Sequence, residues 1–318
     1  MDDNIFQKET TLLVGTGSLT SSLAVCLLNA GHTVILWTND VTESENSIMA
    51  HLSEMNLEND VVEKGRLKIS GEDLTGVENC RMAIVITKEE LAMKRDVIRQ
   101  LEDKLLPDAV IGINSETIGL DVLQQDTKNP GRIIGLNWAE PAHTTMFLEI
   151  VSNPTVNKNI TEYVFNIAKI VWRKDPYIVQ NVGIRSRLIS AMAREAFYLV
   201  ENDYASVEDI DRACRNDAGY YLPFAGNCRY MDLMGTYAYG MVMKDLNPDL
   251  CKDQYLSDFF LNIIKEGALG MENSKGFYQY TKEEINLRRS LASTFSYQIE
   301  KIINKYPFNY KEINPVVN

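Results

Sequence analysis

The first half of the chain alternates short runs of β-branched and aliphatic residues with longer segments whose apolar residues recur every three or four positions. The short runs are typical of buried strands, and the longer segments have the period of helices. This alternation predicts an open, mostly parallel sheet with helices on both faces. The expected strands are 11–14, 33–37, 67–69, 82–86, 109–113, 132–136 and 147–151, with an extended piece at 176–180 and helices at 18–29, 89–104 and 158–170.

The pattern changes near Gln180. Beyond this point amphipathic segments follow one another and β-branched runs disappear, which predicts an all-α region. Ser206, followed by Glu208 and Asp209, is typical of a helix N-terminus. We therefore expect two domains, residues 1–180 and 181–318. The helices expected in the second are 185–202, 207–215, 231–244, 254–265 and 281–305.

Composition narrows the range of functions. The 318 residues are 45% hydrophobic and carry a formal net charge of −12, which argues against a protein that binds nucleic acid backbones. The five cysteines are scattered without CxxC spacing, so neither a metal site nor a disulfide framework is expected. No continuous apolar run predicts a membrane span, and the acidic start lacks the basic region of a secretory signal. A cytoplasmic protein is expected.

A glycine-rich turn lies between the first expected strand and helix. Residues 15–20 read GTGSLT, in the place where a G-x-G-x-x-G sequence binds a dinucleotide. Gly15 would form the tight turn and Gly17 would let the backbone approach a pyrophosphate, with the amides around Ser18 and Leu19 at the positive end of the helix. Thr20 replaces the third glycine. The alternative is a glycine turn that binds nothing.

The acidic residue that normally binds the adenosine ribose of NAD is also altered. The position at the end of the second strand is Thr38, and Asp40 follows two residues later. Since no Arg or Lys lies beside them, a 2′-phosphate has no evident partner. NAD is therefore the expected cofactor.

Several blocks in the same order resemble the 3-hydroxyacyl-CoA dehydrogenase family over nearly the whole chain. This resemblance implies a Rossmann domain, a helical C-terminal domain that commonly dimerises, and NAD-linked oxidation of a 3-hydroxyl to a 3-keto group. A homodimer with a small-molecule substrate is expected. The blocks are VGTG at 14–17, AGHTV at 30–34, GLNWAEP at 135–141, LEIV at 148–151, ASVEDID at 205–211 and NSKGFY at 273–278.

The resemblance implies roles for some residues and removes others. The family's Glu, Lys and Asn near the nicotinamide fall on Glu89, Lys94 and Asn114. Of the four side chains around the reacting carbon, only the Glu is kept, as Glu149. The catalytic Ser, the catalytic His and the Asn of the C-terminal domain fall on Glu116, Asn137 and Ser186, and the Asn of the His block falls on Glu140.

The loss of the family histidine changes the expected chemistry. Asn137 cannot take a proton, but it can donate a hydrogen bond that polarises a carbonyl oxygen. His143 lies in the loop that the family places over the reacting carbon, and either a proton-transfer role or a structural role is open. His32 is expected to be structural, and His51 to lie on a solvated helix face.

The carboxylates gained at the site leave two interpretations open. Glu116, Glu140 and Glu149 would lie close together, so that one is held protonated and acts as acid or base. Alternatively they pair with Arg185 or Arg187.

The substrate remains open in the same way. Residues 41–65 are short and acidic where relatives use a long basic hairpin to hold CoA phosphates, and basic residues are limited to Lys64, Arg66 and Lys68. The candidates are a dehydrogenase of a 3-hydroxyacyl-CoA or 3-hydroxy acid, a dehydrogenase of a small free or cationic hydroxy acid, and a nucleotide-binding homodimer without activity. Trp138, with the aromatic residues Tyr220, Tyr221 and Phe224, either lines the substrate pocket or belongs to the core.

Overall fold

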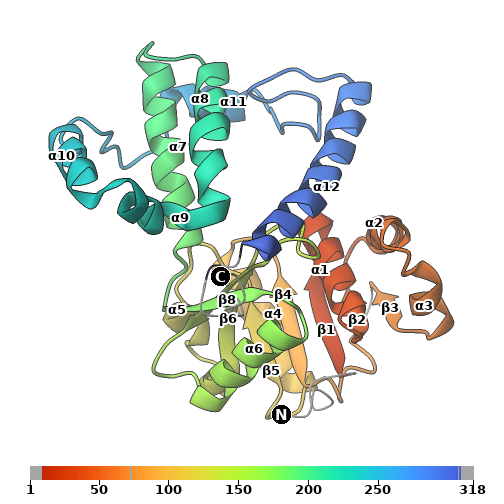
Figure 1. Ribbon diagram of the computed structural model, residues 1–318. Coiled ribbons are helices and arrows are strands. Elements are labelled where there is room, and N and C mark those ends of the chain that lie inside the picture. Colours follow the sequence, from red (N-terminus) through yellow and green to blue (C-terminus); the bar gives the residue numbers. More distant parts are fainter. Residues whose placement is uncertain (1–8, 72–73, 307, 309–318) are drawn as a thin grey trace, which may run out of the picture. The chain divides into compact units, whose positions relative to one another are not determined.

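A computed structural model describes residues 9–71, 74–306 and 308. The chain divides into two compact units, Met1–Ser186 and Arg187–Asn318. The sequence pattern placed this division near Gln180. Figure 1 shows a sheet with flanking helices in the first unit and only helices in the second.

The first unit is built on an 8-stranded sheet in the order β3-β2-β1-β4-β5-β6-β7-β8. The strands from β3 to β6 run parallel, β7 is antiparallel to β6, and β8 is parallel to β7. The mostly parallel sheet is confirmed. Its strands are β1 (Thr10–Gly15), β2 (Thr33–Trp37), β3 (Leu67–Ser70), β4 (Met82–Ile86), β5 (Val110–Ile113), β6 (Ile133–Trp138), β7 (Phe147–Ser152) and β8 (Asp175–Gln180).

Helices connect these strands and cover the sheet (Figure 1). Two of them, α2 and α3, occupy the acidic segment after β2 and form a short polar insertion. Helix α4 begins two residues later than the pattern predicted, because the side chain of Glu89 is used in the loop before it. The helices are α1 (Gly17–Asn29), α2 (Val41–Glu54), α3 (Glu58–Glu63), α4 (Leu91–Lys104), α5 (Leu120–Gln124) and α6 (Lys158–Ile170), with a 3₁₀ turn at Pro130–Arg132.

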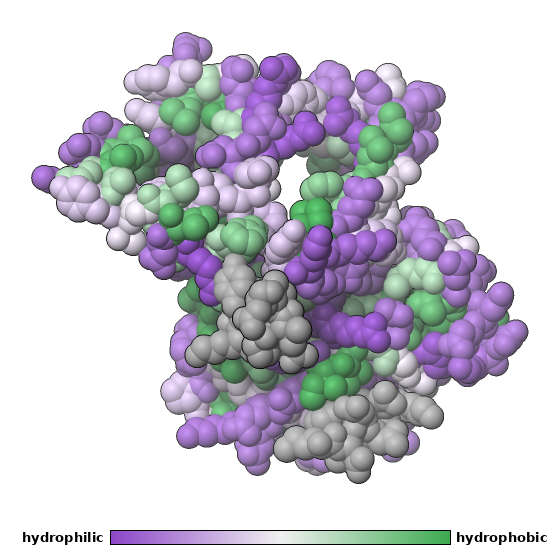
Figure 2. All heavy atoms as spheres, in the orientation of Figure 1, coloured by the Kyte–Doolittle hydropathy of each residue, from purple (hydrophilic) through white to green (hydrophobic). Residues whose placement is uncertain are grey.

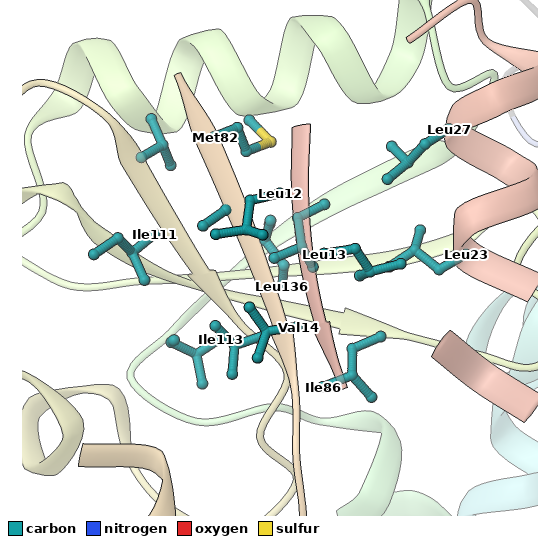
Figure 3. Close-up of a cluster of buried hydrophobic side chains, with 14 of the residues drawn as sticks. Leu12, Leu13, Val14, Leu23, Leu27, Met82, Ile86, Ile111, Ile113 and Leu136 are labelled. Atoms are coloured by element: carbon teal, nitrogen blue, oxygen red, sulfur yellow. The ribbon is translucent and has the colours of Figure 1, made fainter. Parts of the chain in front are cut away.

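The core of this unit lies on both faces of the central strands. Successive side chains of a strand point to opposite faces, and in β1 both Leu12 and Leu13 are fully buried. Figure 3 shows Leu13 pointing toward Leu23 of α1, in the same cluster as Met82 and Ile111 from the neighbouring strands. Burial on both faces explains why these strands read as continuous apolar runs.

The second unit consists of helices, as expected. Ser206 caps α8 in a capping box with Asp209, which confirms that N-terminal signal. The single helix expected over 231–244 is wrong, because Gly235 has φ +105 and separates two helices there. The helices are α7 (Arg185–Glu201), α8 (Val207–Ala213), α9 (Gly219–Met234), α10 (Thr236–Leu246), α11 (Asp258–Lys265) and α12 (Lys282–Lys305), with a π-helical turn at Cys214–Ala218.

The helices of the second unit bury little of their apolar surface. Over residues 187–306 the buried side chains are Ala225, Cys251, Ile285 and Ser296. Figure 2 shows apolar residues at the surface around α10 and along α12. In the described part of the chain, none of the helices combines the length and the apolar character needed to cross a membrane.

Candidate active site

The glycine turn at the end of β1 is shaped by close packing. A Cβ atom on Gly15 would lie 2.1 Å from the carbonyl oxygen of Ile86, so only glycine fits between the ends of β1 and β4. Gly17 has φ +83, a conformation that glycine adopts without strain. Thr20 is accommodated in place of the third glycine because its hydroxyl donates a hydrogen bond to the carbonyl oxygen of Thr16 at 2.9 Å.

The first turn of α1 is open to solvent at Gly17 and Ser18, with Leu19 half-buried. The Thr16 side chain makes no capping hydrogen bond, so the first backbone N–H groups of α1 remain available to an anion. Beside this turn lies a cleft of about 230 Å³. It is lined by Val14, Gly15, Thr16, Trp37, Thr38, Asn39, Gly71, Ile86, Thr87, Lys88, Met93 and Val97. A mostly apolar cleft beside unbonded amides fits an adenine nucleotide.

Thr38 lines this cleft, but its hydroxyl is already engaged in hydrogen bonds within the first unit. Its side chain is buried, and its hydroxyl lies 3.3 Å from the Ser44 hydroxyl and accepts the backbone N–H of Asp40 at 3.2 Å. The Asp40 carboxylate accepts the backbone N–H of Glu43 and caps α2. The exposed side chain that lines the cleft at this position is Asn39.

Glu89 joins the loop after β4 to the loop after β5. One of its carboxylate oxygens accepts the Ser115 hydroxyl at 2.7 Å, and also the backbone N–H groups of Glu116, Thr117 and Ile118 at 3.0, 2.8 and 3.1 Å. Burial raises the pKa of this carboxyl, but these donors and the nearby ammonium of Lys94 outweigh burial and hold its pKa at about 2. Glu89 is therefore a fixed negative charge that orders residues 115–118.

Lys94 is fully buried and holds the other side of the same network. Its ammonium lies 3.2 Å from the second Glu89 oxygen and donates to the backbone carbonyls of Asn114 and Thr87 at 2.7 and 3.3 Å. Burial lowers the pKa of Lys94 and Glu89 opposes that shift. The structure therefore brings together Glu89, Lys94 and Asn114, which the family resemblance placed near the nicotinamide.

Two asparagine side chains continue the pairing of β5 and β6 beyond the end of β5. Asn114 accepts the backbone N–H of Trp138 at 2.9 Å, and Asn137 accepts the backbone N–H of Ser115 at 2.9 Å. Each side chain thus replaces a backbone carbonyl of the neighbouring strand. This exchange fixes Asn137 relative to the loop that Glu89 orders.

Asn137 forms a buried pair with Glu149 across β6 and β7. Its Nδ2 donates to one Glu149 oxygen at 2.9 Å, and the other oxygen accepts the Tyr177 hydroxyl at 3.1 Å and the Ile184 N–H at 2.8 Å. Both ends of the amide are fixed, because a backbone N–H must donate to its oxygen and a carboxylate must accept from its nitrogen. Gly183 packs against the pair, since a Cβ there would lie 2.3 Å from Glu149.

Glu116 lies at the partly exposed edge of this network. Its carboxylate forms an ion pair of 3.0 Å with Arg185. Burial raises the pKa of Glu116, Arg185 lowers it, and the charges of Glu89 and Glu149 raise it further, so the net shift is upward. Glu140 is exposed and is not among the charges that act on Glu116. The expected carboxylate cluster therefore reduces to Glu116 and Glu149, with Arg185 beside them.

His143 lies in a different environment from the one expected. Its ring packs on His51 of α2, with the ring centroids 4.8 Å apart. Burial, His51 and Lys174 lower its pKa to about 4 against a hydrogen bond at Ser22 that raises it. The groups that act on His143 are therefore those of α1, α2 and Lys174. The contact also corrects the expectation that His51 lies on a solvated face.

Other residues that the sequence singled out, His32, Trp138 and Tyr221, have partners within their own unit. His32 is structural, as expected: its ring bonds to the Glu9 carbonyl at 3.1 Å and accepts the Trp172 indole N–H at 3.0 Å. Trp138 belongs to the core, 1% exposed and 5.4 Å from the ring of Trp172. Tyr221 stacks on Tyr230. Among the described residues no cluster of His, Cys, Asp or Glu could hold a metal ion.

Four contributors were not found from the sequence. Tyr177, Gly183, Asn39 and Lys88 carry no motif, and their roles depend on how strands and loops meet. Gly183 had one signal, its place at the start of the helical half. The others become visible only when the cleft and the buried pair are assembled.

Comparison with known proteins decides what this arrangement represents. Residues 10–182 match the model of the 3-hydroxyacyl-CoA dehydrogenase NAD binding domain, and residues 184–280 match that of the 3-hydroxyacyl-CoA dehydrogenase C-terminal domain. The chain belongs to the 3-hydroxyacyl-CoA dehydrogenase family. Its first unit is the NAD-binding domain of that family, and the glycine turn, the open first turn of α1 and the cleft fit that cofactor.

Individual relatives differ in their substrates. The chain is 26% identical over 223 residues to 5-formyl-3-hydroxy-2-methylpyridine 4-carboxylate 5-dehydrogenase of Mesorhizobium japonicum, covering 68% of each chain. It is 23% identical over 283 residues to 3-hydroxybutyryl-CoA dehydrogenase of Clostridioides difficile, covering 85% of this chain and 99% of that protein. A solved structure of a 5-formyl-3-hydroxy-2-methylpyridine 4-carboxylic acid 5-dehydrogenase, described as an NAD⁺ dependent dismutase, shares the fold with a TM-score of 0.85 at 19% identity, over 95% of this chain and all of that chain.

The Glu89 network predicts a pH-dependent contribution to stability. The pKa of Glu89 is lowered in the folded protein, so its stabilising effect is present above the ordinary Glu pKa and is lost as the pH falls toward 2. Because the carboxylate is partly exposed and screened by solvent, we expect Glu89→Gln to lower the free energy of unfolding near neutral pH by roughly 1 to 2 kcal/mol. Urea unfolding monitored by circular dichroism measures this difference.

The matched control is Glu90→Gln. Glu90 is exposed, precedes α4 without a capping hydrogen bond and should change the stability by less than about 0.5 kcal/mol. Equal effects of the two substitutions would contradict the role given to Glu89.

Proposed function

We propose that this family member is an NAD-dependent oxidoreductase that interconverts a 3-hydroxy acid and its 3-keto form, and that the acid is small and free rather than a CoA thioester. The family supports the reaction class. The free acid is supported by the few basic residues at the insertion after β2 and by the contacts that they already make.

That insertion offers little to the phosphates of CoA. Three basic residues lie at its end and just after it, and two of them, Lys64 and Arg66, pair with Asp60, Arg66 at 2.6 Å. The Lys68 ammonium approaches the carbonyl oxygen of Thr75 at 3.5 Å. Helices α2 and α3 otherwise carry mainly acidic charge. A highly anionic ligand would meet repulsion here, whereas a small acid would not need this surface.

The name of one relative also supports a free acid as the substrate. The Mesorhizobium japonicum protein is named for a small free pyridine carboxylate that carries a formyl group. The Clostridioides difficile protein is named for a CoA thioester. The family therefore supports the proposed reaction. The insertion after β2 supports the choice of a free acid as the substrate.

The roles of the site residues follow from their contacts. Bound NAD would accept a hydride from the carbon that bears the hydroxyl group. Gly15, Gly17 and the first amides of α1, with Ser18 and Leu19, would hold the pyrophosphate. Glu89, Lys94 and Asn114 would order the loops beside the nicotinamide half. Thr38 supports the turn from within.

Oxidation of the hydroxyl group also releases a proton, and Glu116 is the group we assign to receive it. Its carboxylate is partly exposed, and its raised pKa brings it closer to the range in which a carboxylate works as a general base. Asn137 is 1% exposed, so we assign it a positioning role, in which its amide holds Glu149 and the Ser115 N–H in place. In the reductive direction protonated Glu116 returns the proton.

His143 is the alternative candidate for the residue that takes the proton. Its environment is built from His51, Lys174 and α1, and its low pKa makes it a weak base near neutral pH. Its contacts support a structural role between α1, α2 and the loop after β6. We therefore assign the proton to Glu116 in preference to His143.

A catalytically inactive nucleotide-binding protein is the second candidate. The observation that favours it is the burial of Asn137 and Glu149, which are 1% and 0% exposed and engaged in hydrogen bonds that stabilise the fold. Such a protein would bind NADH and turn over no keto acid.

We also propose that a second copy of the chain covers the helical unit. Its helices leave large apolar side chains at the surface, among them Leu188, Tyr237 and Phe295 at 68%, 80% and 61% exposure. Contiguous exposed apolar surface marks an interaction site. Sedimentation of the full chain should give about twice the mass of 36.1 kDa, and a monomer would refute the dimer.

A substrate panel tests the proposed function. NADH consumption should be measured with free 3-keto acids of increasing size and with the CoA thioesters of the same acids. We expect turnover of at least one free acid with kcat/KM about tenfold or more above that of its thioester, since each tenfold is 1.4 kcal/mol of differential binding. Higher kcat/KM for the thioesters would refute the free-acid assignment. Binding of NADH without any turnover would support the inactive candidate.

Two substitutions separate the proton-transfer assignments. Glu116→Gln removes the base and should lower kcat about a hundredfold or more, the usual contribution of general base catalysis. His143→Gln should leave kcat within about threefold because its contacts are structural. NADH binding, measured by fluorescence, is the control for folding in both variants. A large loss of kcat in His143→Gln alone would reverse the assignment.

A further inference from the structure

Among the residues that the structure describes, none supplies this cleft with the carboxylate that normally selects against a phosphorylated ribose. In NAD-binding domains an acidic residue after the second strand binds the ribose hydroxyl groups, and its charge repels a 2′-phosphate. Here the exposed side chain that lines the cleft after β2 is the neutral Asn39. The part of the cleft lining that the structure describes contains no Asp or Glu.

The neighbouring residues cannot simply replace that carboxylate. The hydroxyl of Thr38 is buried and bonded to Ser44 and to the backbone of Asp40. The carboxylate of Asp40 caps the first turn of α2 through the N–H of Glu43 and is not part of the cleft lining. The side chains of Thr38 and Asp40 therefore stabilise the start of α2, and Asn39 is the side chain that can contact the ribose.

One positive charge lines the same cleft. Lys88 follows β4, is exposed, and makes no ion pair within the part of the chain that the structure describes. The sequence alone gave no basic partner for a 2′-phosphate, because Lys88 is distant from Thr38 in the chain. The parallel sheet places the ends of β2, β1 and β4 side by side and brings Lys88 and Asn39 to one cleft.

We infer that this cleft accepts the 2′-phosphorylated dinucleotide NADP(H) as well as NAD(H), with Asn39 as the residue that permits the phosphate and Lys88 as the charge that compensates it. An amide donates a hydrogen bond to either a ribose hydroxyl or a phosphate oxygen, whereas a carboxylate accepts from the first and repels the second. The inference rests on the NAD-binding domain and not on the substrate proposed above.

The test compares two dissociation constants on the full chain without substrate. NADH and NADPH are titrated separately and the fluorescence of the nicotinamide is recorded. We expect the Kd for NADPH to lie within about tenfold of that for NADH. In Asn39→Asp the ratio of the NADPH to the NADH constant should rise about tenfold or more, because a carboxylate then faces the phosphate. Lys88→Met should raise the same ratio.

Asn39→Gln is the matched control, since it keeps the amide and adds no charge, and its ratio should remain within about threefold of the wild type. A wild-type Kd for NADPH more than about tenfold above that for NADH overturns the inference. So does an unchanged ratio in both Asn39→Asp and Lys88→Met. Failure of the substrate panel would leave these constants unaffected, so the two claims fail separately.

Discussion

The site depends on the need to satisfy a partly exposed carboxylate at the end of the sheet. Glu89 lies after β4, where the chain leaves the sheet, and the loop after β5 supplies the donors for one of its oxygens. Lys94 supplies the charge for the other. If either partner were missing, an ionised carboxyl group would lie in a half-buried position without compensation. The arrangement therefore fixes Ser115 and Glu116, and through the Ser115 amide it fixes Asn137.

The same constraint explains the contacts of Asn137, at the position where the family resemblance led us to expect a histidine. Asn137 keeps both a donor toward Glu149 and an acceptor for the Ser115 amide. Glu149 in turn receives Tyr177 and the amide that precedes α7. The hydrogen bonds of the site are complete with asparagine, but an asparagine side chain does not titrate and so cannot transfer a proton. We assign proton transfer to Glu116, which pairs with Arg185 at the partly exposed edge of these hydrogen bonds and has a raised pKa.

The sequence predicts the sheet well because its strands are buried on both faces and separated by regular helices. The capping box at Ser206 and Asp209 is equally local and was found. The break at Gly235 was missed because apolar periodicity runs through it, while the backbone there takes a positive φ. The burial of Thr38 was also missed, since it depends on the hydroxyl of Ser44 and on the start of α2.

In the candidate site, too, features that depend on residues distant in the chain could not be predicted. Glu89, Lys94, Asn114, Asn137 and Glu149 could be named in advance, because the family resemblance gives their positions. The environment of His143 could not be predicted, because it is set by the contact of its ring with His51 of α2. Lys88 and Asn39 are separated in the chain and meet only through the order of the strands.

The pH dependence of kcat/KM for oxidation of the preferred hydroxy acid, measured in the wild type and in two variants, tests the central claim most directly. The account assigns the base to Glu116, whose pKa is raised above the ordinary value of Glu. The rate should therefore fall as the pH drops through that pKa, because the carboxylate becomes protonated. This acid limb should persist in His143→Gln and disappear in Glu116→Gln. A limb that persists in Glu116→Gln and disappears in His143→Gln would contradict the account.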